Sequence, residues 1–387
     1  MKVTKHFKQF IHSESSGGII LIAATILTVL SANFIFREQF ALFWHSNFLG
    51  KSLEFWVNDV LMSIFFLMVG LEIEREIYIG ELSKIKQALL PIIAALGGML
   101  VPAMIYIGFN LSTGNIHGFG IPMATDIAFS LTVLTLLGKR IPVSLKVFLT
   151  ALAIIDDLGA IVVIALFYTS NFSFLYLALA LALLGIMFIF NRKGIRNLLF
   201  YFIPGIAMWI FVYQAGIHPT IAAVLLAFVI PFGNGDQHSP SYKLQLKLHT
   251  PVAFLVLPIF AIANTGIILH AESFTALFTE NGLGILLGLI VGKPLGILLF
   301  SYAAIKLHIS QMFESMQYKH ILGAGMVAGI GFTMSIFISI LAFDSAEMID
   351  ISKLSVFVAS IISAFAGYLF LRYSYSDTKM KRKHSID

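Results

Sequence analysis

Long apolar runs follow one another along this chain, with only short polar stretches between them. Six lie in the first half, near residues 19–36, 55–73, 88–109, 121–137, 143–168 and 173–190. Six more lie in the second half, near 198–213, 217–232, 252–269, 283–303, 321–343 and 354–372. A helix of about 20 apolar residues crosses the hydrocarbon core of a bilayer. The pattern therefore predicts an all-α membrane protein with about twelve transmembrane helices.

Composition indicates one membrane-embedded domain. Hydrophobic residues make up 58% of the 387 residues and charged residues only 12%, whereas soluble domains are about 25% charged. We expect a single polytopic domain over 1–387, with a cytoplasmic N-terminus (1–18), a transmembrane core (19–372) and a cytoplasmic basic tail (373–387). The chain has no cysteine, which excludes disulfides and zinc-thiolate or iron–sulfur sites, and we expect no cofactor.

The distribution of basic residues predicts the orientation in the membrane. Of the 25 Lys and Arg residues, 21 fall in segments on the side of the N-terminus, three fall on the opposite side, and Lys293 lies within a span. Cytoplasmic loops carry this excess in membrane proteins. Both termini are therefore predicted to be cytoplasmic, and the net charge of +5 reflects topology and not nucleic-acid binding.

Four ionisable residues lie inside the apolar spans: Asp126, Asp156, Asp157 and Lys293. A charge at the bilayer centre costs about 2.5 to 3.5 kcal/mol, so each needs a partner or a function. The adjacent Asp156 and Asp157 occupy the middle of their span, where burial and mutual repulsion favour the neutral form. A carboxylate in that position holds either a proton or a cation. This competition for one site is what an ion exchanger requires.

The other two charges have both a functional and a structural interpretation. Asp126 and Thr125 follow Pro122, where we expect the helix to be interrupted, and their oxygens suit a hard cation such as sodium. Alternatively, Asp126 caps a half-helix. Lys293, followed by Pro294, must pair with an acid or lose its proton, and the candidates are Asp156 and Asp157. This pair either carries a proton or is a stabilising buried ion pair.

Three further residues are candidates for a pH response. Glu72 and Glu76 lie one helical turn apart in GLEIEREI, at the predicted cytoplasmic end of the second span. They form either a cation-attracting entrance or a solvated helix end. His218 precedes Pro219, and histidine titrates near physiological pH, although a structural role is equally open. Asp59, at the other end of the second span, is interpreted as a cap or an interhelical hydrogen-bond partner.

A short internal similarity indicates an inverted repeat. Residues 127–130, Ile-Ala-Phe-Ser, resemble residues 330–333, Ile-Gly-Phe-Thr. The two segments lie in corresponding halves of the chain, in spans that Pro122 and the glycines Gly329 and Gly331 are expected to break. Broken helices at matching positions point to a transporter whose binding site lies where they meet.

An ordered set of motifs covers nearly the whole chain and resembles the NhaA-type bacterial sodium/proton antiporters. The motifs are SGGIILI, WVNDVLMSIFFLMVGLEIERE, IAALGGMLVPA, IPMATDIAF, FLTALAIIDDLGAI, VLPIFAIANTG, VGKP and GIGFTMSIFI. The resemblance implies twelve helices, with spans 4 and 11 unwound and crossing. It also implies a bacterial inner-membrane transporter, not an enzyme, that exports Na⁺ or Li⁺ for H⁺ and serves pH homeostasis and salt tolerance.

The resemblance further implies roles for individual residues. Asp157 becomes the principal sodium ligand with Thr125 nearby, Asp126 compensates the facing helix dipoles, and Asp156 pairs with Lys293. Exchange carries more protons than sodium ions, so it is electrogenic. The partners implied are membrane lipid and a second copy of the chain, bound through the extracellular segment 37–54. Two positions depart from the family pattern, Glu74 and Gln245, so its pH threshold does not carry over.

Three other classes of membrane protein fit the residues less well. An intramembrane aspartyl protease needs its two aspartates on separate helices, one of them in a Gly-x-Gly-Asp sequence, which neither Asp126 nor Asp157 has. A sodium symporter for an organic substrate needs a larger polar cavity than these apolar spans suggest. An ion channel is built on rings of repeated polar residues, and this chain has one asymmetric acidic cluster.

Overall fold

A computed structural model describes residues 5–35, 37–169, 172–267, 271–313 and 316–383. Residues 1–4 and 384–387, at the two ends expected to be cytoplasmic, lie outside the described residues. The chain forms two compact units, each assembled from separate stretches of sequence. One comprises Met1–Ala23, Lys84–Ala160 and Ile267–Asp387, and the other comprises Ala24–Ser83 and Ile161–Gly266. We call them the first and the second unit.

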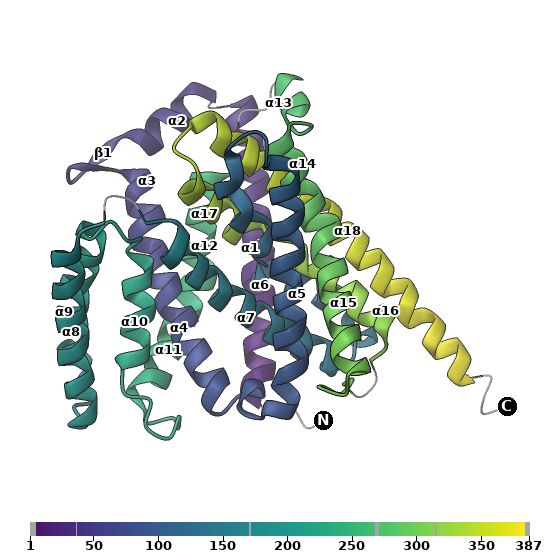
Figure 1. Cartoon of the computed structure of the whole chain (residues 1–387), viewed down its shortest axis with the longest axis horizontal. Coiled ribbons are helices and arrows are strands. Elements are labelled where there is room, and N and C mark those ends of the chain that lie inside the picture. Colours follow the sequence, from purple (N-terminus) through teal and green to yellow (C-terminus); the bar gives the residue numbers. More distant parts are fainter. Residues whose placement is uncertain (1–4, 36, 170–171, 268–270, 314–315, 384–387) are drawn as a thin grey trace. The chain divides into compact units, whose positions relative to one another are not determined.

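The first unit consists of helices (Figure 1). Its elements are α5 (Ile85–Asn110), η3 (Asn115–Met123), α6 (Ile127–Leu136), η4 (Gly138–Arg140), α13 (Ala271–Ala276), α14 (Glu280–Leu287), η6 (Gly288–Gly292), α15 (Lys293–Lys306), α16 (Tyr318–Ala328), α17 (Phe332–Ala342) and α18 (Ala346–Lys383). Helices α1 (Lys5–Phe34) and α7 (Val143–Phe167) contribute residues to both units.

The second unit adds a small hairpin to its helices. Its elements are α2 (Arg37–His45), β1 (Asn47–Phe48), β2 (Lys51–Ser52), α3 (Leu53–Phe55), η1 (Trp56–Leu61), α4 (Met62–Tyr78), η2 (Glu81–Ser83), α8 (Phe174–Arg192), α9 (Leu199–Gln214), α10 (Thr220–Val229), α11 (Pro240–Pro251), η5 (Val252–Val256) and α12 (Leu257–Asn264). The strands pair antiparallel across Leu49 and Gly50. Both turn residues have positive φ, as a two-residue hairpin turn requires.

The described residues contain nine helices that are long and apolar enough to cross a membrane. The pair α16 and α17, bent by 52° at its break, makes a tenth candidate if it counts as one span. Helices α9 and α10 are apolar but shorter than the others. These elements lie where the sequence predicts spans, with one clear difference. The ninth predicted span starts at Pro240 instead of residue 252, because Ser239 caps the helix and Pro240 occupies its first position.

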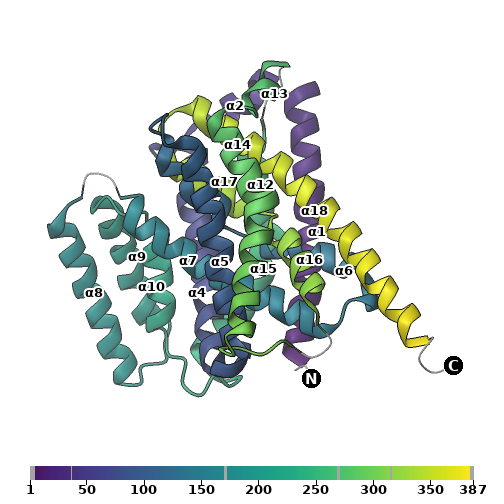
Figure 2. The same cartoon turned by 45° about the vertical axis from the view of Figure 1, so that its right-hand side comes forward.

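Helices α5 and α15 lie side by side in both cartoon views (Figures 1 and 2). Their backbones touch at two glycines. A Cβ atom on Gly97 would lie 2.3 Å from the carbonyl oxygen of Gly296, and one on Gly296 would lie 2.1 Å from that of Gly97. Only glycine permits this approach. It seats the beginning of α15, and therefore Lys293, against α5.

Two spans of the first unit are interrupted. Residues 124–126 separate η3 from α6, two positions beyond Pro122, and residues 329–331 separate α16 from α17. The second break coincides with the two glycines expected to cause it. Helix α17 packs against η3, and α16 contacts α6. Each half of one interrupted span therefore contacts the opposite half of the other, and we call this the interrupted-span contact.

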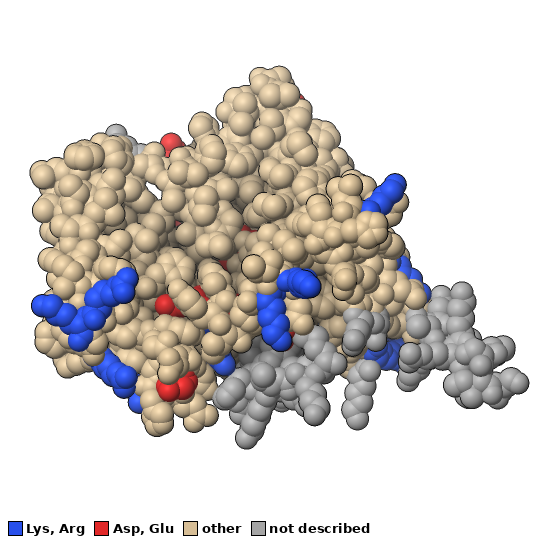
Figure 3. Space-filling view, turned by 60° about the horizontal axis from the view of Figure 1, so that its bottom comes forward, with Lys and Arg blue, Asp and Glu red and all other residues tan. Residues whose placement is uncertain are grey.

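Lysine and arginine side chains are more widespread than acidic ones on the surface viewed in Figure 3. Figure 3 views the side that lies at the bottom of Figure 1, and shows lysine and arginine at several places around it with acidic atoms at only a few. Most of the remaining visible surface carries neither charge. This distribution is the one expected of the cytoplasmic side of a membrane protein.

Candidate cation site

Asp156, in the middle of α7, is the centre of the buried polar cluster in the first unit. Its Oδ2 atom lies 2.9 Å from the Lys293 ammonium nitrogen. The same oxygen accepts a hydrogen bond of 2.7 Å from the Thr125 hydroxyl. Its other oxygen, Oδ1, is buried and has no hydrogen-bond partner among the described residues. A buried carboxylate oxygen in that state is a natural ligand for a proton or a hard cation.

Thr125 and Lys293 also contact backbone carbonyls at the two breaks. The Thr125 hydroxyl lies 3.0 Å from the carbonyl oxygen of Ala328, and Lys293 donates to the carbonyl of Met123. A hydroxyl carries one proton, so Thr125 can donate to Asp156 or to Ala328, but not to both at once. The partner of Thr125 therefore depends on what Asp156 binds.

Asp126 has a different environment, because its carboxylate caps two helices. Its Oδ1 accepts the amide of Phe129 in the first turn of α6 at 2.9 Å. Its Oδ2 accepts both the amide and the hydroxyl of Thr333, near the start of α17, at 3.1 and 2.6 Å. The amide of Asp126 itself donates to the carbonyl of Ile330 at 2.7 Å. A negative charge at two helix N-termini is favourable, since both dipoles point their positive ends at it.

Asp157 completes the group of candidate residues. It is buried, with 3% of its surface exposed, and lies close enough to Lys293 to interact with it electrostatically. The first unit therefore brings together all five predicted ion-binding residues, namely Thr125, Asp126, Asp156, Asp157 and Lys293. This arrangement can hold a small cation on carboxylate and hydroxyl oxygens, away from water.

Comparison with known proteins identifies the family. The model of the family described as Na⁺/H⁺ antiporter 1 matches residues 8–371. The chain belongs to this antiporter family. It is 52% identical over 379 residues to the Na⁺/H⁺ antiporter NhaA 1 of Flavobacterium johnsoniae, covering 98% of this chain and all of that protein. It is 47% identical over 371 residues to the Na⁺/H⁺ antiporter NhaA of Vibrio cholerae, covering 95% of this chain and 97% of that one.

Membership confirms the resemblance noted in the sequence and settles the class of protein. An Na⁺/H⁺ antiporter is a multi-pass membrane transporter and not an enzyme. It uses no cofactor, because the sodium ions and protons are its cargo. The buried oxygens of the first unit have to be assessed as ligands that bind and release ions, not as holders of a resident metal.

The residues considered for a pH response lie in the second unit. Glu72 is buried with 7% of its surface exposed, whereas Glu76 accepts the amide of Glu81 at 2.9 Å at the end of α4. Glu74, which departs from the family pattern, is buried and accepts a hydrogen bond of 3.1 Å from Ser241 in α11. This chain therefore satisfies the extra acid with a hydroxyl from a neighbouring helix.

The second departure from the antiporter pattern, Gln245, is also accommodated locally. Its side-chain oxygen accepts a hydrogen bond of 3.4 Å from Arg75, whose guanidinium stacks 5.0 Å above the ring of Tyr242. An arginine over an aromatic face is held by a cation–π attraction. Ser241, Tyr242 and Gln245 of α11 thus all contact the end of α4, a connection that the sequence did not indicate.

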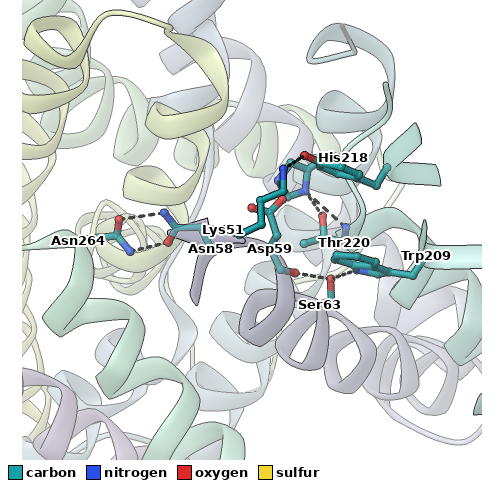
Figure 4. Close-up of polar contacts among 9 residues, drawn as sticks. Lys51, Asn58, Asp59, Ser63, Trp209, His218, Thr220 and Asn264 are labelled. Carbon is teal, nitrogen blue, oxygen red and sulfur yellow. Dashed lines mark hydrogen bonds and ion pairs between the residues drawn. The ribbon is translucent and has the colours of Figure 1, made fainter. Parts of the chain in front are cut away.

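His218 lies in a second polar cluster, shown in Figure 4. Its Nε2 atom is 3.5 Å from Asp59 of η1, and its Nδ1 atom is 2.8 Å from the hydroxyl of Thr220. Since Nδ1 accepts the Thr220 amide at 3.5 Å, we assign the proton to Nε2, which points it at Asp59.

The rest of this cluster is held by amide and hydroxyl groups. Asn58 and Asn264 exchange hydrogen bonds of 2.7 and 3.4 Å through their side-chain amides (Figure 4). Ser63 donates to the carbonyl of Asp59 at 2.6 Å and accepts the indole N–H of Trp209 at 2.7 Å. The carbonyl of Asp59 thus accepts a hydrogen bond within its own helix, while its carboxylate lies near His218.

Sequence reasoning missed three hydroxyl residues in the interrupted spans: Ser130, Thr333 and Ser335. The structure places all three in hydrogen bonds between α6, α17 and the opposite span. A signal was present, because serine and threonine recur within the otherwise apolar residues 330–339. Nothing in the sequence alone shows which backbone carbonyl each hydroxyl reaches.

Proposed function

We propose that this chain is an electrogenic, pH-regulated antiporter of the bacterial inner membrane that extrudes Na⁺ or Li⁺ in exchange for protons. The observation that carries the proposal is the environment of Asp156. One of its oxygens is held by Lys293 and Thr125, and the other is buried without a hydrogen-bond partner among the described residues. A site of this kind is stabilised by either a proton or a cation, and each excludes the other.

The ligands proposed for sodium are Asp157, Asp156 and the hydroxyl of Thr125. Asp157 is the principal ligand and Asp156 contributes its Oδ1 atom. Asp126 remains hydrogen-bonded to α6 and α17 and balances their helix dipoles. Lithium binds to the same oxygens, because it is also a hard cation.

The charge carried by exchange follows from the number of protons released. The Asp156–Lys293 pair and Asp157 are two separate places that hold a proton in the absence of sodium. Binding of one sodium ion releases a proton from each, so one net positive charge crosses the membrane per cycle. The membrane potential then drives sodium out of the cell, since each charge moved is worth about 2.3 kcal/mol per 100 mV.

The proposed architecture has twelve spans, with spans 4 and 11 crossing at their breaks. The bent pair and the short helices α9 and α10 supply the three spans beyond the nine long helices. The interrupted-span contact supports the crossing, because each half-span contacts the opposite half of the other. The basic face in Figure 3 supports cytoplasmic termini.

A homodimer through residues 37–54 is part of the proposal. This segment contains the β1–β2 hairpin, whose Phe48 and Leu49 side chains are 55% and 77% exposed. Exposed apolar side chains at a strand edge are suited to contact a second copy.

We also propose that Glu72, Glu76 and His218 take part in the pH response. Glu72 and Glu76 share one face of α4, where a change in protonation alters the local charge by up to two units. In the described conformation the Nδ1 atom of His218 accepts the Thr220 amide, so the imidazole is neutral. Its contribution therefore requires a conformation in which water reaches the imidazole.

Acid-loaded proteoliposomes test the exchange directly. Sodium added outside should enter as protons leave, and a dye in the lumen should report alkalinisation. In these vesicles each cycle carries one net positive charge out of the lumen. An inside-negative potential, set with potassium and valinomycin, should therefore slow the exchange. Asp157→Asn and Asp156→Asn should abolish the response.

The matched control is Asp59→Asn, a partly buried acid of the second unit outside the proposed site. It should still exchange ions. If Asp157→Asn retained sodium-driven alkalinisation at the unchanged rate, the proposed competition at Asp157 would be wrong. Lumen alkalinisation that did not depend on sodium would refute exchange altogether.

A further inference from the structure

Helical serines and threonines in the first unit show two different hydrogen-bond patterns. A buried hydroxyl on a helix usually donates to the carbonyl four residues earlier in its own helix. Thr132 and Thr135 do this in α6, and Ser339 does it in α17, at 2.7 to 2.8 Å. Ser130 and Ser335 lie on the same two helices but donate elsewhere.

Both exceptional serines reach across the interrupted-span contact. The hydroxyl of Ser130, on α6, donates to the carbonyl of Val327 at 3.1 Å, near the end of α16. The hydroxyl of Ser335, on α17, donates to the carbonyl of Ile121 at 2.6 Å, near the end of η3. Both serines are completely buried. Each interrupted span therefore donates one serine hydroxyl to the other.

These carbonyls belong to helix ends, where backbone acceptors lack partners within the helix. Val327 lies in the last turn of α16, and its carbonyl also accepts the amide of Ile330 at 3.1 Å. Ile121 lies in the last turn of η3, just before the break. Each serine hydroxyl adds a donor to a carbonyl beside a break, and a buried hydrogen bond of this kind stabilises the broken end.

The position of Gly331 supports a specific role for Ser335. A Cβ atom on residue 331 would lie 2.1 Å from the Ser335 hydroxyl oxygen. The glycine therefore leaves the space in which this hydroxyl can turn toward Ile121 instead of the carbonyl of its own helix. The glycine at the break is therefore what permits the hydroxyl contact.

Thr333 and the amide of Asp126 also donate across the breaks, and two donors of the cation site contact carbonyls of the same spans. Thr125 contacts the carbonyl of Ala328 and Lys293 contacts that of Met123, while both also contact Asp156. Both donors therefore share Asp156 with the ion that it would bind. Ser130 and Ser335 instead donate to backbone carbonyls, which do not titrate.

We propose that Ser130 and Ser335 are positioning residues for cation exchange, whose hydroxyls hold the two interrupted spans together while Thr125 and Lys293 change partners. This inference rests on the proposed function of the first unit. The serines do not touch the ion. They fix η3 and α16 relative to α6 and α17, and so set the place of Thr125 and of the carbonyls beside the site.

Sodium-dependent exchange in proteoliposomes tests the role. Ser130→Ala and Ser335→Ala should each raise the apparent KM for sodium by roughly three- to tenfold, the loss expected for one hydrogen bond, with the maximal rate within about twofold. A raised KM at an unchanged maximal rate indicates weaker ion binding. A purely structural role would lower the amount of folded protein without this split.

Ser339→Ala is the matched control, because Ser339 is equally buried on α17 and donates only within its own helix. Its KM for sodium should equal that of the wild-type protein. An unchanged KM in both folded alanine variants of Ser130 and Ser335 would overturn the proposal, as would an equal rise in Ser339→Ala. If an alanine variant does not fold, the cysteine variant is measured, since S–H donates weakly and its KM should rise in the same direction. An unchanged KM there also overturns the proposal.

Asp157→Asn in the same vesicles separates this inference from the proposed function. If Asp157→Asn exchanges ions normally, the cation site has been misplaced and the proposed function fails. If Asp157→Asn is inactive while the serine variants have the same KM for sodium as the wild-type protein, only the positioning role fails.

Discussion

Asp156 and Asp59 each lie near a basic side chain, but in different surroundings. Asp156 is 2.9 Å from Lys293, and neither side chain has any exposed surface. Asp59 is 3.5 Å from His218, with side chains that are 17% and 11% exposed. The first pair is fully buried and its base is a lysine, whereas the second pair is only partly buried and its base is a histidine. Proximity of an acid and a base is therefore not enough to make an ion carrier.

The difference predicts first that the two pairs contribute unequally to stability. Lys293→Met leaves Asp156 buried without its cation and should cost about 3 to 5 kcal/mol of unfolding free energy. His218→Gln should cost about 1 kcal/mol or less, because the Asp59 contact is long and partly hydrated. Thermal unfolding of the detergent-solubilised proteins measures both. Equal losses in the two variants would remove the distinction between the pairs.

The second expected effect concerns acid. The Nδ1 atom of His218 accepts the Thr220 amide in the folded protein, and a second proton on the imidazole would remove that acceptor. Thermal unfolding should therefore occur at a lower temperature at pH 5 than at pH 7.5.

His218→Gln provides the control for this pH dependence. The variant lacks the imidazole, so its melting temperature should fall less than that of the unchanged chain over the same pH interval. If both proteins lose the same stability, another group is responsible for the acid sensitivity and His218 does not carry it.

The smallest expected effect is on transport by Asp59→Asn. An asparagine retains an oxygen that can accept the His218 Nε2 proton, and the site of the first unit is unchanged. Sodium-driven exchange should stay within about twofold of the unchanged rate, less than the effect of one hydrogen bond. A loss as large as that of Asp156→Asn would mean that the second unit carries ions itself.

Much of the fold could be predicted because apolar runs of membrane length are a direct signal. The breaks at residues 124–126 and 329–331 also followed from local chemistry, through Pro122 and the two glycines. The start of α11 could not be predicted from hydropathy, because Lys243 and Lys247 lower it there. The cap formed by Ser239 and Pro240 was a better guide.

The candidate site was predictable to the level of residue type but not of contact. Intramembrane charges singled out Asp156 and Lys293, since each is costly unless it is paired. The sequence left Asp156 and Asp157 open as partners of Lys293, and the structure places Asp156 at 2.9 Å. The hydroxyls of Ser130, Ser241 and Ser335 were not predicted, because a serine in an apolar span gives no indication of which acceptor it reaches.

The contact of Gly97 with Gly296 has a practical consequence for anyone who stabilises this protein for biochemical work. Replacing a helical glycine by alanine ordinarily raises the free energy of unfolding by about 0.5 to 1 kcal/mol. The substitution is therefore a common choice in thermostability screens. At these two positions the new methyl group would lie 2.1 to 2.3 Å from a backbone oxygen. The helices would be forced apart one turn from Lys293, so a stability screen should spare both glycines.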